Sequence, residues 1–523
     1  MLSKPHQRAH GRSAIELKDL ENGAVSNTFQ MLTDDVPDGR DSPHDAYTTL
    51  SFQQKKNIVF LILLYLIQGV PMGLVKGSIP YFLKPHCTYS DIAIYSLAAY
   101  PYSLKVLWSP IVDTYYFPNF GRRKTWVAPC TFFLACTLLF FSYNIDVWIE
   151  RGSSYIKSFT VWSFFLVFIC ATQDIAVDGW SLNMLDAHQL NYASTAQTVG
   201  LNTGFFLSFT VLLVLTSPEF ANSLLRLSPL DEGLITLSGY IRFWALITLI
   251  SVIFVLFWEE QKPDRVASMR DTFRSIRDIL SLKNMKQLMV VHLFGKVGFV
   301  ANETLTLLKA TEFGLSKAML SLIILINFPL GLILGVYIGH ISNNRPLYVW
   351  LWGYWGRTSS ILFNIALVYA VAHFSEKFSM FLSILVCYTL NASFMTVQFV
   401  SIGVFHSQIS DPAIGGTYMT ILNTLSNLGG TWPQYIMLKL TDWVTFSYCS
   451  TDDSLQCITD DLKNQCMDSG GHCIYKRDGY YFTSIVGIFL SIFLCIIAIF
   501  PIVRQLNKVS ASSWHIHGKY SSI

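Results

Sequence analysis

Charged residues are scarce in this chain. Asp, Glu, Lys and Arg make up only 14% of its 523 residues, whereas a soluble globular domain carries about 25%. Hydrophobic residues reach 52% and aromatic residues 15%. This composition argues against an ordinary soluble protein and indicates a membrane protein.

A signal-peptide pattern is also missing. The first 57 residues are polar and rich in Asp, Ser and Arg, and they contain no apolar core of the kind that a cleavable signal peptide has. We therefore expect residues 1–57 to form a disordered cytosolic tail.

Long apolar runs fill most of the remaining chain. About 20 apolar residues in a helix cross the hydrocarbon core of a bilayer. Twelve segments meet this requirement: 58–83, 92–112, 125–145, 158–180, 195–216, 239–258, 288–307, 319–340, 348–372, 379–404, 417–438 and 481–503. The sequence thus predicts an all-α membrane protein with twelve transmembrane helices.

An even number of spans places both termini on one side of the membrane. With the termini in the cytosol, that side carries 21 Lys and Arg residues and the opposite side carries eleven. This agrees with the positive-inside rule. The residues after the last span, 504–523, then form a second cytosolic tail.

Four cysteines share the one long loop on the opposite side, 439–480: Cys449, Cys457, Cys466 and Cys473. The loop lacks the close Cys-x-x-Cys pairs that zinc sites favour, so we expect no metal there. Two disulfides fit better and require an oxidising compartment. Their pairing is left open.

The spans divide into two sets of six. Residues 58–258 form the first set, a basic cytosolic linker occupies 259–287, and residues 288–503 form the second. An offset of 228 residues relates Gln68 to Lys296 and also Pro101 to Pro329. We infer an internal duplication. Two six-helix halves with the substrate between them describe the major facilitator architecture.

Charged groups inside spans indicate function, because hydrocarbon disfavours them. Lys105 and Lys296 lie well inside spans two and seven, and we expect them to contact the substrate. Lys76 and Arg242 are close enough to span ends for their charges to reach the membrane surface. Arg357 is expected to pair with a carboxylate.

Other polar residues accompany these lysines. Glu303 lies two helical turns from Lys296, and an excess of positive charge favours an anionic substrate. The candidate substrate contacts are Lys105, Lys296, Gln68, Gln173, Glu303, Gln398 and Asn427. Each Asn or Gln can equally join helices to one another.

A second polar group is predicted at the cytosolic surface. Asp113, Arg122 and Arg123 follow span two, and "QDIAVDGW" at the end of span four contains Asp174 and Asp178. Ion pairs among these five residues are expected to close an inner gate. Asp174, one turn deeper than Asp178, either joins the gate or takes up a proton.

Several stretches resemble one known family. "QGVPMGLVKGSIPYFL", "SLKVLWSPIVD", "NFGRRKTW", "ATQDIAVDGW" and "SDPAIGGTYMTILNTLSNLGGTWP" are similar to segments of the endoplasmic reticulum acetyl-coenzyme A transporters, which belong to the major facilitator superfamily. The resemblance runs from about residue 51 to the last span. More distantly, the chain resembles bacterial muropeptide permeases.

This resemblance implies a multi-pass protein of the endoplasmic reticulum membrane that carries acetyl-coenzyme A into the lumen, and it suggests a homodimer. Coenzyme A carries about four negative charges near neutral pH, which Lys105 and Lys296 can meet. One departure concerns the gate: Asp113 stands eight residues before Gly121, farther than in sugar porters.

Two alternatives remain at this point. Another bulky anion, such as glutathione disulfide or a muropeptide, would suit the same basic site. A membrane-embedded acetyltransferase would need a general base, for which His292 and His340 are the intramembrane candidates. We expect a transporter rather than an enzyme, with the lipid bilayer as its surroundings and with no cofactor and no nucleic-acid partner.

Overall fold

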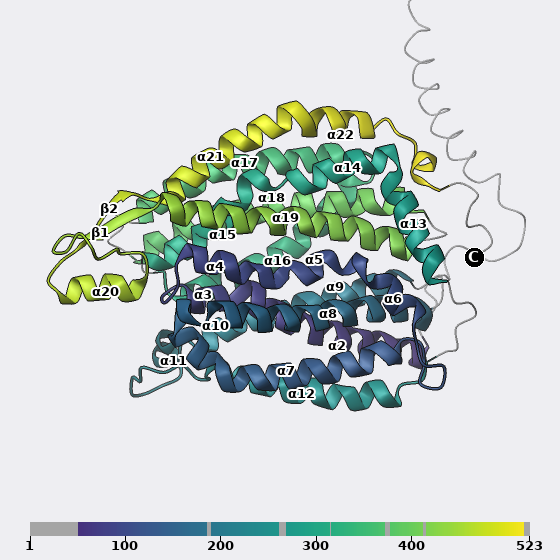
Figure 1. Cartoon of the computed structure of the whole chain (residues 1–523), viewed down its shortest axis with the longest axis horizontal. Helices are drawn as coiled ribbons and strands as arrows, with labels where there is room; N and C mark the ends of the chain where they lie inside the picture. Colours follow the sequence, from purple (N-terminus) through teal and green to yellow (C-terminus); the bar gives the residue numbers. More distant parts are fainter. Residues whose placement is uncertain are drawn as a thin grey trace, which may run out of the picture. The chain divides into compact units, whose positions relative to one another are not determined.

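The computed structural model describes residues 51–185, 190–260, 268–313, 315–371, 377–411 and 415–516, which fold mainly into α-helices (Figure 1). The predicted tails at 1–57 and 504–523 and the predicted linker at 259–287 lie partly outside the described residues. For those parts the predictions stay predictions.

The first half contains six membrane-spanning segments. In order they are α2 (Phe52–Gly73) continued by η1 (Leu74–Ser78) and α3 (Ile79–Leu83); α4 (Tyr89–Ser96), η2 (Leu97–Ala99), α5 (Tyr100–Leu104), η3 (Lys105–Leu107) and α6 (Ser109–Thr114); α7 (Lys124–Glu150); α8 (Ile156–Met184); α9 (Leu190–Phe206), η6 (Leu207–Val211) and α10 (Leu212–Leu215); and α12 (Leu237–Phe257). The short elements η4 (Gly152–Ser154) and α11 (Pro218–Leu224) lie between them.

The second half repeats this number of segments. In order they are α14 (Lys283–Phe294) with α15 (Val297–Glu312); α16 (Lys317–Ser342); α17 (Pro346–Val371); α18 (Lys377–Ile409); α19 (Gly415–Val444); and α21 (Gly479–Leu494) with η8 (Cys495–Ile499) and α22 (Phe500–Leu506). The linker helix α13 (Met269–Ser281) precedes them and η9 (Ala511–Trp514) follows.

The predicted twelve segments are thus confirmed as helices. Nine helices of the described residues are long and apolar enough to cross a membrane by length and composition alone. The other three segments are the broken run 89–114, α17 and α19. Polar residues such as Arg357 and Asn427 interrupt the hydrophobic runs of the last two.

Prolines and a lysine mark the breaks within segments. Pro101 and Pro110 stand in the first turns of α5 and α6, where the missing N–H of proline does no harm. The seventh segment breaks at Lys296, between α14 and α15. Broken helices leave backbone groups free to meet a ligand.

The two halves meet along two sets of helices. The elements α4 and α5 pack against α19, and η6 with α10 packs against α16. One hydrogen bond across the first contact joins the hydroxyls of Ser103 and Thr431 at 2.9 Å, and both side chains are buried.

Close glycine contacts repeat in the two halves. A Cβ on Gly204 of α9 would stand 2.3 Å from the backbone oxygen of Leu66 in α2. A Cβ on Gly429 of α19 would stand 1.8 Å from the backbone oxygen of His292 in α14. The first and fifth segments therefore approach each other as the seventh and eleventh do, which supports the inferred duplication.

A small lobe, residues 446–477, joins α19 to α21. Strands β1 (Phe446–Cys449) and β2 (Cys473–Arg477) pair antiparallel and enclose helix α20 (Asp460–Asp468). We call residues 446–477 the disulfide lobe. It lies at one end of the helices, the lobe side, whereas α6 and α13 lie at the other end, the linker side (Figure 1).

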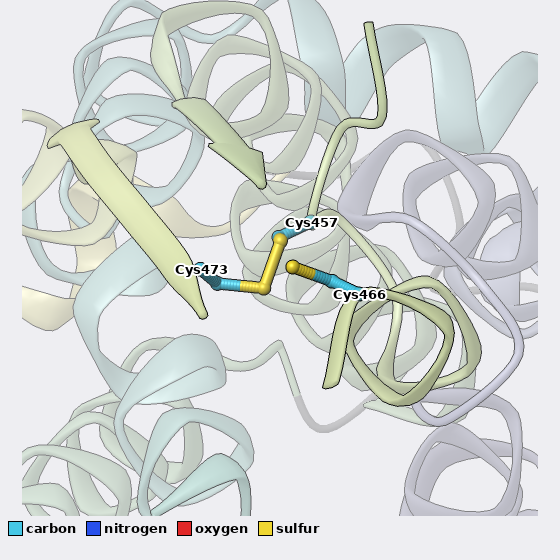
Figure 2. Close-up of side chains that lie close together, drawn as sticks. All are labelled: Cys457, Cys466 and Cys473. Atoms are coloured by element: carbon cyan, nitrogen blue, oxygen red, sulfur yellow. A yellow bond between two sulfur atoms is a disulfide. The ribbon is translucent and has the colours of Figure 1, made fainter. Parts of the chain in front are cut away.

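The two disulfides predicted for this loop are confirmed, and the structure gives their pairing. Cys449 is bonded to Cys466, and Cys457 to Cys473. Figure 2 shows the sulfur of Cys466 beside the Cys457–Cys473 bond; these three sulfurs lie within 4.8 Å of one another. All four thiols are used in the two bonds, so the cluster offers no free thiolate for a metal.

Candidate functional site

Lys105, a predicted substrate contact, lies in a buried ion pair. It occupies the 3₁₀ turn η3, and its ammonium pairs with the carboxylate of Asp174 in α8. A second carboxylate oxygen, from Asp178, lies 3.7 Å away. Two residues that we assigned to the gate therefore hold a residue that we assigned to the substrate.

Asp178 is the more accessible of the two acids. Its carboxylate accepts hydrogen bonds from the Tyr65 hydroxyl at 2.9 Å and from the Gln197 amide at 2.8 Å. Its side chain is 36% exposed, whereas that of Asp174 is 0% exposed. The spacing of four residues puts both acids on one face of α8, where they share Lys105.

The rest of the predicted gate gathers at the linker side. Arg123 pairs with the carboxylate of Asp113 at 2.7 Å, and the side chain of Arg122 donates to the backbone oxygen of Asp113 at 2.6 and 3.0 Å. Glu260 accepts the backbone N–H groups of Arg123 and Lys124, which start α7. A carboxylate at this helix end is favoured by the helix dipole.

These gate contacts stay within the first half of the chain. Arg123 lies against Gly179, since a Cβ there would stand 2.2 Å from the guanidinium carbon. The described ion pairs of Asp178 and Asp174 involve Lys105 rather than this arginine. Their role in gating stays a prediction.

Arg357 forms the main polar group of the second half, as expected for a residue predicted to pair with a carboxylate. Its guanidinium binds Glu303 through two nitrogens, with Nε 2.7 Å from one carboxylate oxygen. A third nitrogen donates to the Gln398 amide oxygen at 2.6 Å. This network ties α15, α17 and α18 together, so Glu303 and Gln398 are already engaged without a substrate.

Gln173 makes an equivalent contact in the first half. Its amide nitrogen donates to the hydroxyl of Thr131 at 2.6 Å, which joins α8 to α7. Gln398 joins α18 to α17 in the second half. Matching positions of the two repeats therefore both connect neighbouring helices, the alternative that we left open for these amides.

Lys296 is the predicted ligand that keeps its charge free of a carboxylate. Its ammonium donates to the backbone oxygen of Ser426 at 2.8 Å. Among the described residues no carboxylate oxygen lies within ion-pairing distance of it. Gly430, the repeat partner of Gly204, leaves space beside its side chain: an added Cβ would stand 3.6 Å from Cδ.

Lys76 was missed as a functional residue, because it seemed near enough to a span end to reach the surface. It is the exposed member of η1, and the other four residues of that turn are buried. Its ammonium lies 5.6 Å from the Tyr102 ring centre, on the side of α5, and it is close enough to Lys296 to repel it. Two lysines from opposite halves thus share one region.

Two predicted amides complete the picture. Gln68 is fully buried, and neither its amide nitrogen nor its amide oxygen has a partner among the described residues. A buried amide is costly unless something satisfies it. The side chain of Asn427 is partly exposed on α19.

A buried ion network on the lobe side joins the two halves, and the sequence analysis did not find it. Lys84, after α3, pairs with Glu312 at the end of α15 at 2.6 Å. The Tyr89 hydroxyl donates to the same carboxylate at 2.7 Å. Lys309 bridges Glu312 at 2.9 Å and Asp478 at 2.7 Å.

The repeat could have revealed this contact. Lys84 and Glu312 are separated by 228 residues, the offset that relates Gln68 to Lys296. Equivalent positions of two halves lie at equal distances from the axis that relates them, so such residues can meet if they lie near it. Opposite charges at one repeat position are the signal.

The comparisons with known proteins agree with this architecture. A family model described as acetyl-coenzyme A transporter 1 matches residues 57–269, 258–348 and 341–516. An uncharacterised protein of Schizosaccharomyces pombe is 66% identical over 99% of both chains. The anhydromuropeptide permease of Escherichia coli is 27% identical over 30% of this chain and 31% of its own.

Solved structures show the fold. The nucleoside transporter NupG aligns with a TM-score of 0.55 at 12% identity, covering 85% of this chain and 99% of that chain. A bacterial homologue of the lysosomal transporter Spinster, in an inward-facing conformation, aligns with a TM-score of 0.56 at 12% identity, covering 88% and 98%.

Proposed function

Because the chain belongs to the acetyl-coenzyme A transporter 1 family, we propose that it carries acetyl-coenzyme A from the cytosol into the lumen of the endoplasmic reticulum by alternating access. The chain is a multi-pass membrane transporter and not an enzyme. The substrate, the compartment and the direction are the parts that we propose.

The observation that carries the substrate is the pair Lys76 and Lys296. They come from opposite halves and repel each other. Buried or confined like charges are unfavourable, and an anion between them removes the repulsion. The phosphates of coenzyme A supply such an anion, and the unsatisfied amide of Gln68 offers a donor and an acceptor nearby in α2.

Lys105 has a conditional part in this proposal. Asp174 and Asp178 hold it in the described state. It reaches a substrate phosphate only when that pair opens, so the two acids would then compete with the substrate for one ammonium.

The orientation follows from the disulfide lobe. Its two disulfides require an oxidising compartment, which supports a lumenal lobe side and a cytosolic linker side with both termini. The predicted homodimer rests on the family resemblance and stays a proposal.

The muropeptide permease of Escherichia coli supports a second candidate substrate class, a muropeptide-like anion. Glutathione disulfide is a third bulky anion to compare. The acetyltransferase alternative has little support, since the His292 Nε2 contacts that of His406 at 3.0 Å within the second half and both side chains are buried.

The test is uptake of labelled acetyl-coenzyme A into liposomes that contain the purified protein, with coenzyme A, glutathione disulfide and a muropeptide as competitors. We expect saturable uptake that coenzyme A blocks best. Lys76→Ala and Lys296→Ala should each raise the half-saturation concentration about tenfold, as loss of one charge contact implies. The exposed Lys157→Ala is the control. Block mainly by another anion would overturn the substrate.

A further inference from the structure

The disulfide lobe reaches from one half of the transporter to the other. Its covalent attachments, α19 and α21, belong to the second half. Its helix α20 contacts the segment 84–89, which belongs to the first half. The backbone N–H groups of Asp460 and Asp461 donate to the backbone oxygen of Pro85 at 3.0 and 3.4 Å. The Asp461 carboxylate also contacts His86 Nδ1 at 2.8 Å.

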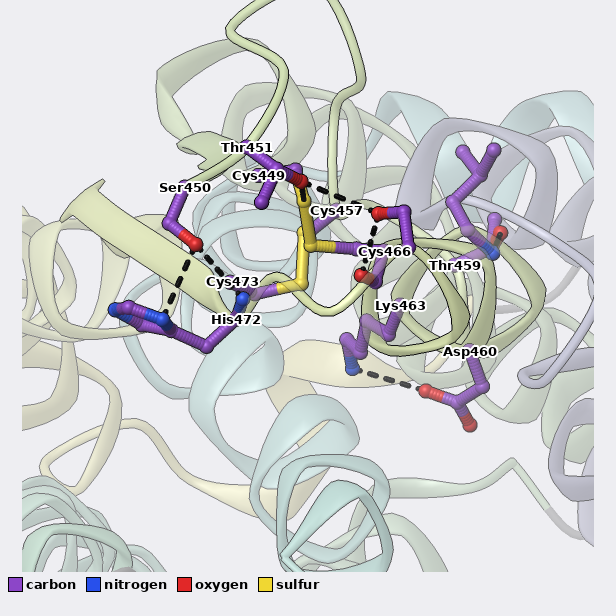
Figure 3. The surroundings of a disulfide bond; sticks show 12 residues. Cys449, Ser450, Thr451, Cys457, Thr459, Asp460, Lys463, Cys466, His472 and Cys473 are labelled. Carbon is purple, nitrogen blue, oxygen red and sulfur yellow. Dashed lines mark hydrogen bonds and ion pairs between the residues drawn. A yellow bond between two sulfur atoms is a disulfide. The ribbon is translucent and has the colours of Figure 1, made fainter.

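The same helix reaches the buried ion network. Lys463 lies 3.7 Å from the Glu312 carboxylate and 2.9 Å from that of Asp460 (Figure 3). Burial lowers the pKa of Lys463, but the nearby carboxylates, Glu312 foremost, outweigh that effect and leave the pKa above its ordinary value. Lys463 therefore adds a permanent positive charge to the contact between Lys84 and Glu312.

The two disulfides fix α20 in this position. Cys457 stands just before the helix and is bonded to β2, while Cys466 lies within it and is bonded to the end of β1. Both ends of α20 are thus tied to the hairpin, and Thr459 caps the helix through the backbone N–H of Leu462. The lobe can move as one piece but can hardly change shape.

We propose that the disulfide lobe is a clasp that locks the lobe side shut, and that α20 must release the segment 84–89 before the site between the halves opens on that side. The inference rests on the alternating access of the proposed function, but not on the identity of the substrate. The clasp holds the first half by two kinds of contact: the helix end on the Pro85 oxygen and the ammonium of Lys463 on Glu312.

A rigid clasp has a defined mechanical role. Opening the lobe side breaks the Lys84–Glu312 pair, which is buried and therefore needs water or another partner at once. Lys463 stays with Glu312 in the second half and supplies that partner. Loss of Lys463 leaves Glu312 with Lys309, whereas loss of the Asp461 contact frees α20 itself.

The experiment measures the distance between the halves without any substrate. Spin labels are placed on Lys157→Cys at the start of α8 and on Trp443→Cys at the end of α19, in a background with the exposed Cys136 changed to Ser. Double electron–electron resonance then reports the distances in Lys463→Ala and Asp461→Ala. The control is Lys476→Ala, an exposed lysine of β2.

We expect Lys463→Ala and Asp461→Ala each to add a population at longer distance, and the control to match the parent. Replacing Cys457 and Cys473 by Ser should add the same population. Unchanged distances in Lys463→Ala and Asp461→Ala would overturn the clasp, whether or not the cysteine variant folds. Since no substrate is present, a shift in distance together with absent acetyl-coenzyme A uptake would keep the clasp and refute the proposed substrate.

Discussion

The network of Arg357, Glu303 and Gln398 gives the sharpest prediction of stability. Glu303→Leu removes the carboxylate from a guanidinium that is 6% exposed in a span. An unpaired buried charge of this kind costs about 3–5 kcal/mol. Arg357→Met should cost a similar amount, because it leaves the Glu303 carboxylate, 13% exposed, without its partner.

The double variant, Glu303→Leu with Arg357→Met, should recover most of the loss. Replacing a whole buried pair by apolar side chains is often neutral or stabilising. Only the Gln398 amide oxygen then lacks its donor, at about 1–3 kcal/mol. We expect the double variant to be more stable than either single variant.

The assay is denaturation of the purified protein in detergent, compared across wild type, both single variants and the double variant. The control is Arg242→Met, an exposed arginine that lies 5.0 Å from the Tyr143 ring, a contact worth about 0.5–1 kcal/mol. Additive losses in the double variant would show that Arg357 and Glu303 do not stabilise each other, and would refute this reading of the network.

Three further outcomes follow from the geometry. Gly429→Ala should destabilise the protein strongly, since the added Cβ meets the His292 carbonyl, whereas Gly403→Ala should be neutral or slightly stabilising because nothing lies within 4 Å of its Cβ; thermal unfolding of both variants checks this. Asp174→Asn should lower stability more than Asp178→Asn does, since Asp174 is fully buried on Lys105; equal losses in the same assay would argue against the assigned pair. Removing either disulfide of the lobe should cost about 3 kcal/mol by its loop of 16 or 17 residues, and hydrogen exchange should rise in the lobe but stay unchanged in the spans.

Much of the fold could be predicted because hydrocarbon length and apolar composition decide it. The boundaries were less accurate: α2 begins at Phe52, six residues before the predicted span. The polar residues Gln53 and Gln54 are helical although they lie outside any apolar window. Hydropathy finds the part of a helix in hydrocarbon, not the turns that extend into water.

The pairing of charges could be predicted only in part. Periodicity placed Asp174 and Asp178 on one face of α8, and both contact Lys105. It could not tell that this lysine, rather than Arg123, faces them, because the rotation of one helix against another depends on packing. The missed pair of Lys84 and Glu312 was accessible through the repeat offset.

Lys76 illustrates a second limit. Its distance from the span end suggested that it reaches the surface, yet the π-helical turn η1 directs it toward Tyr102. One additional residue in a helical turn rotates every side chain that follows. Such a turn is not apparent from hydrophobic periodicity.

Counterflow tests the central claim most directly. Liposomes containing the protein are loaded with unlabelled acetyl-coenzyme A and diluted into a trace of the labelled compound. A carrier with alternating access predicts transient accumulation of label above its equilibrium level, and this overshoot should fall in Lys296→Ala but not in Lys157→Ala. Simple equilibration without overshoot, or no entry of label while a muropeptide or glutathione disulfide does exchange, would contradict the account.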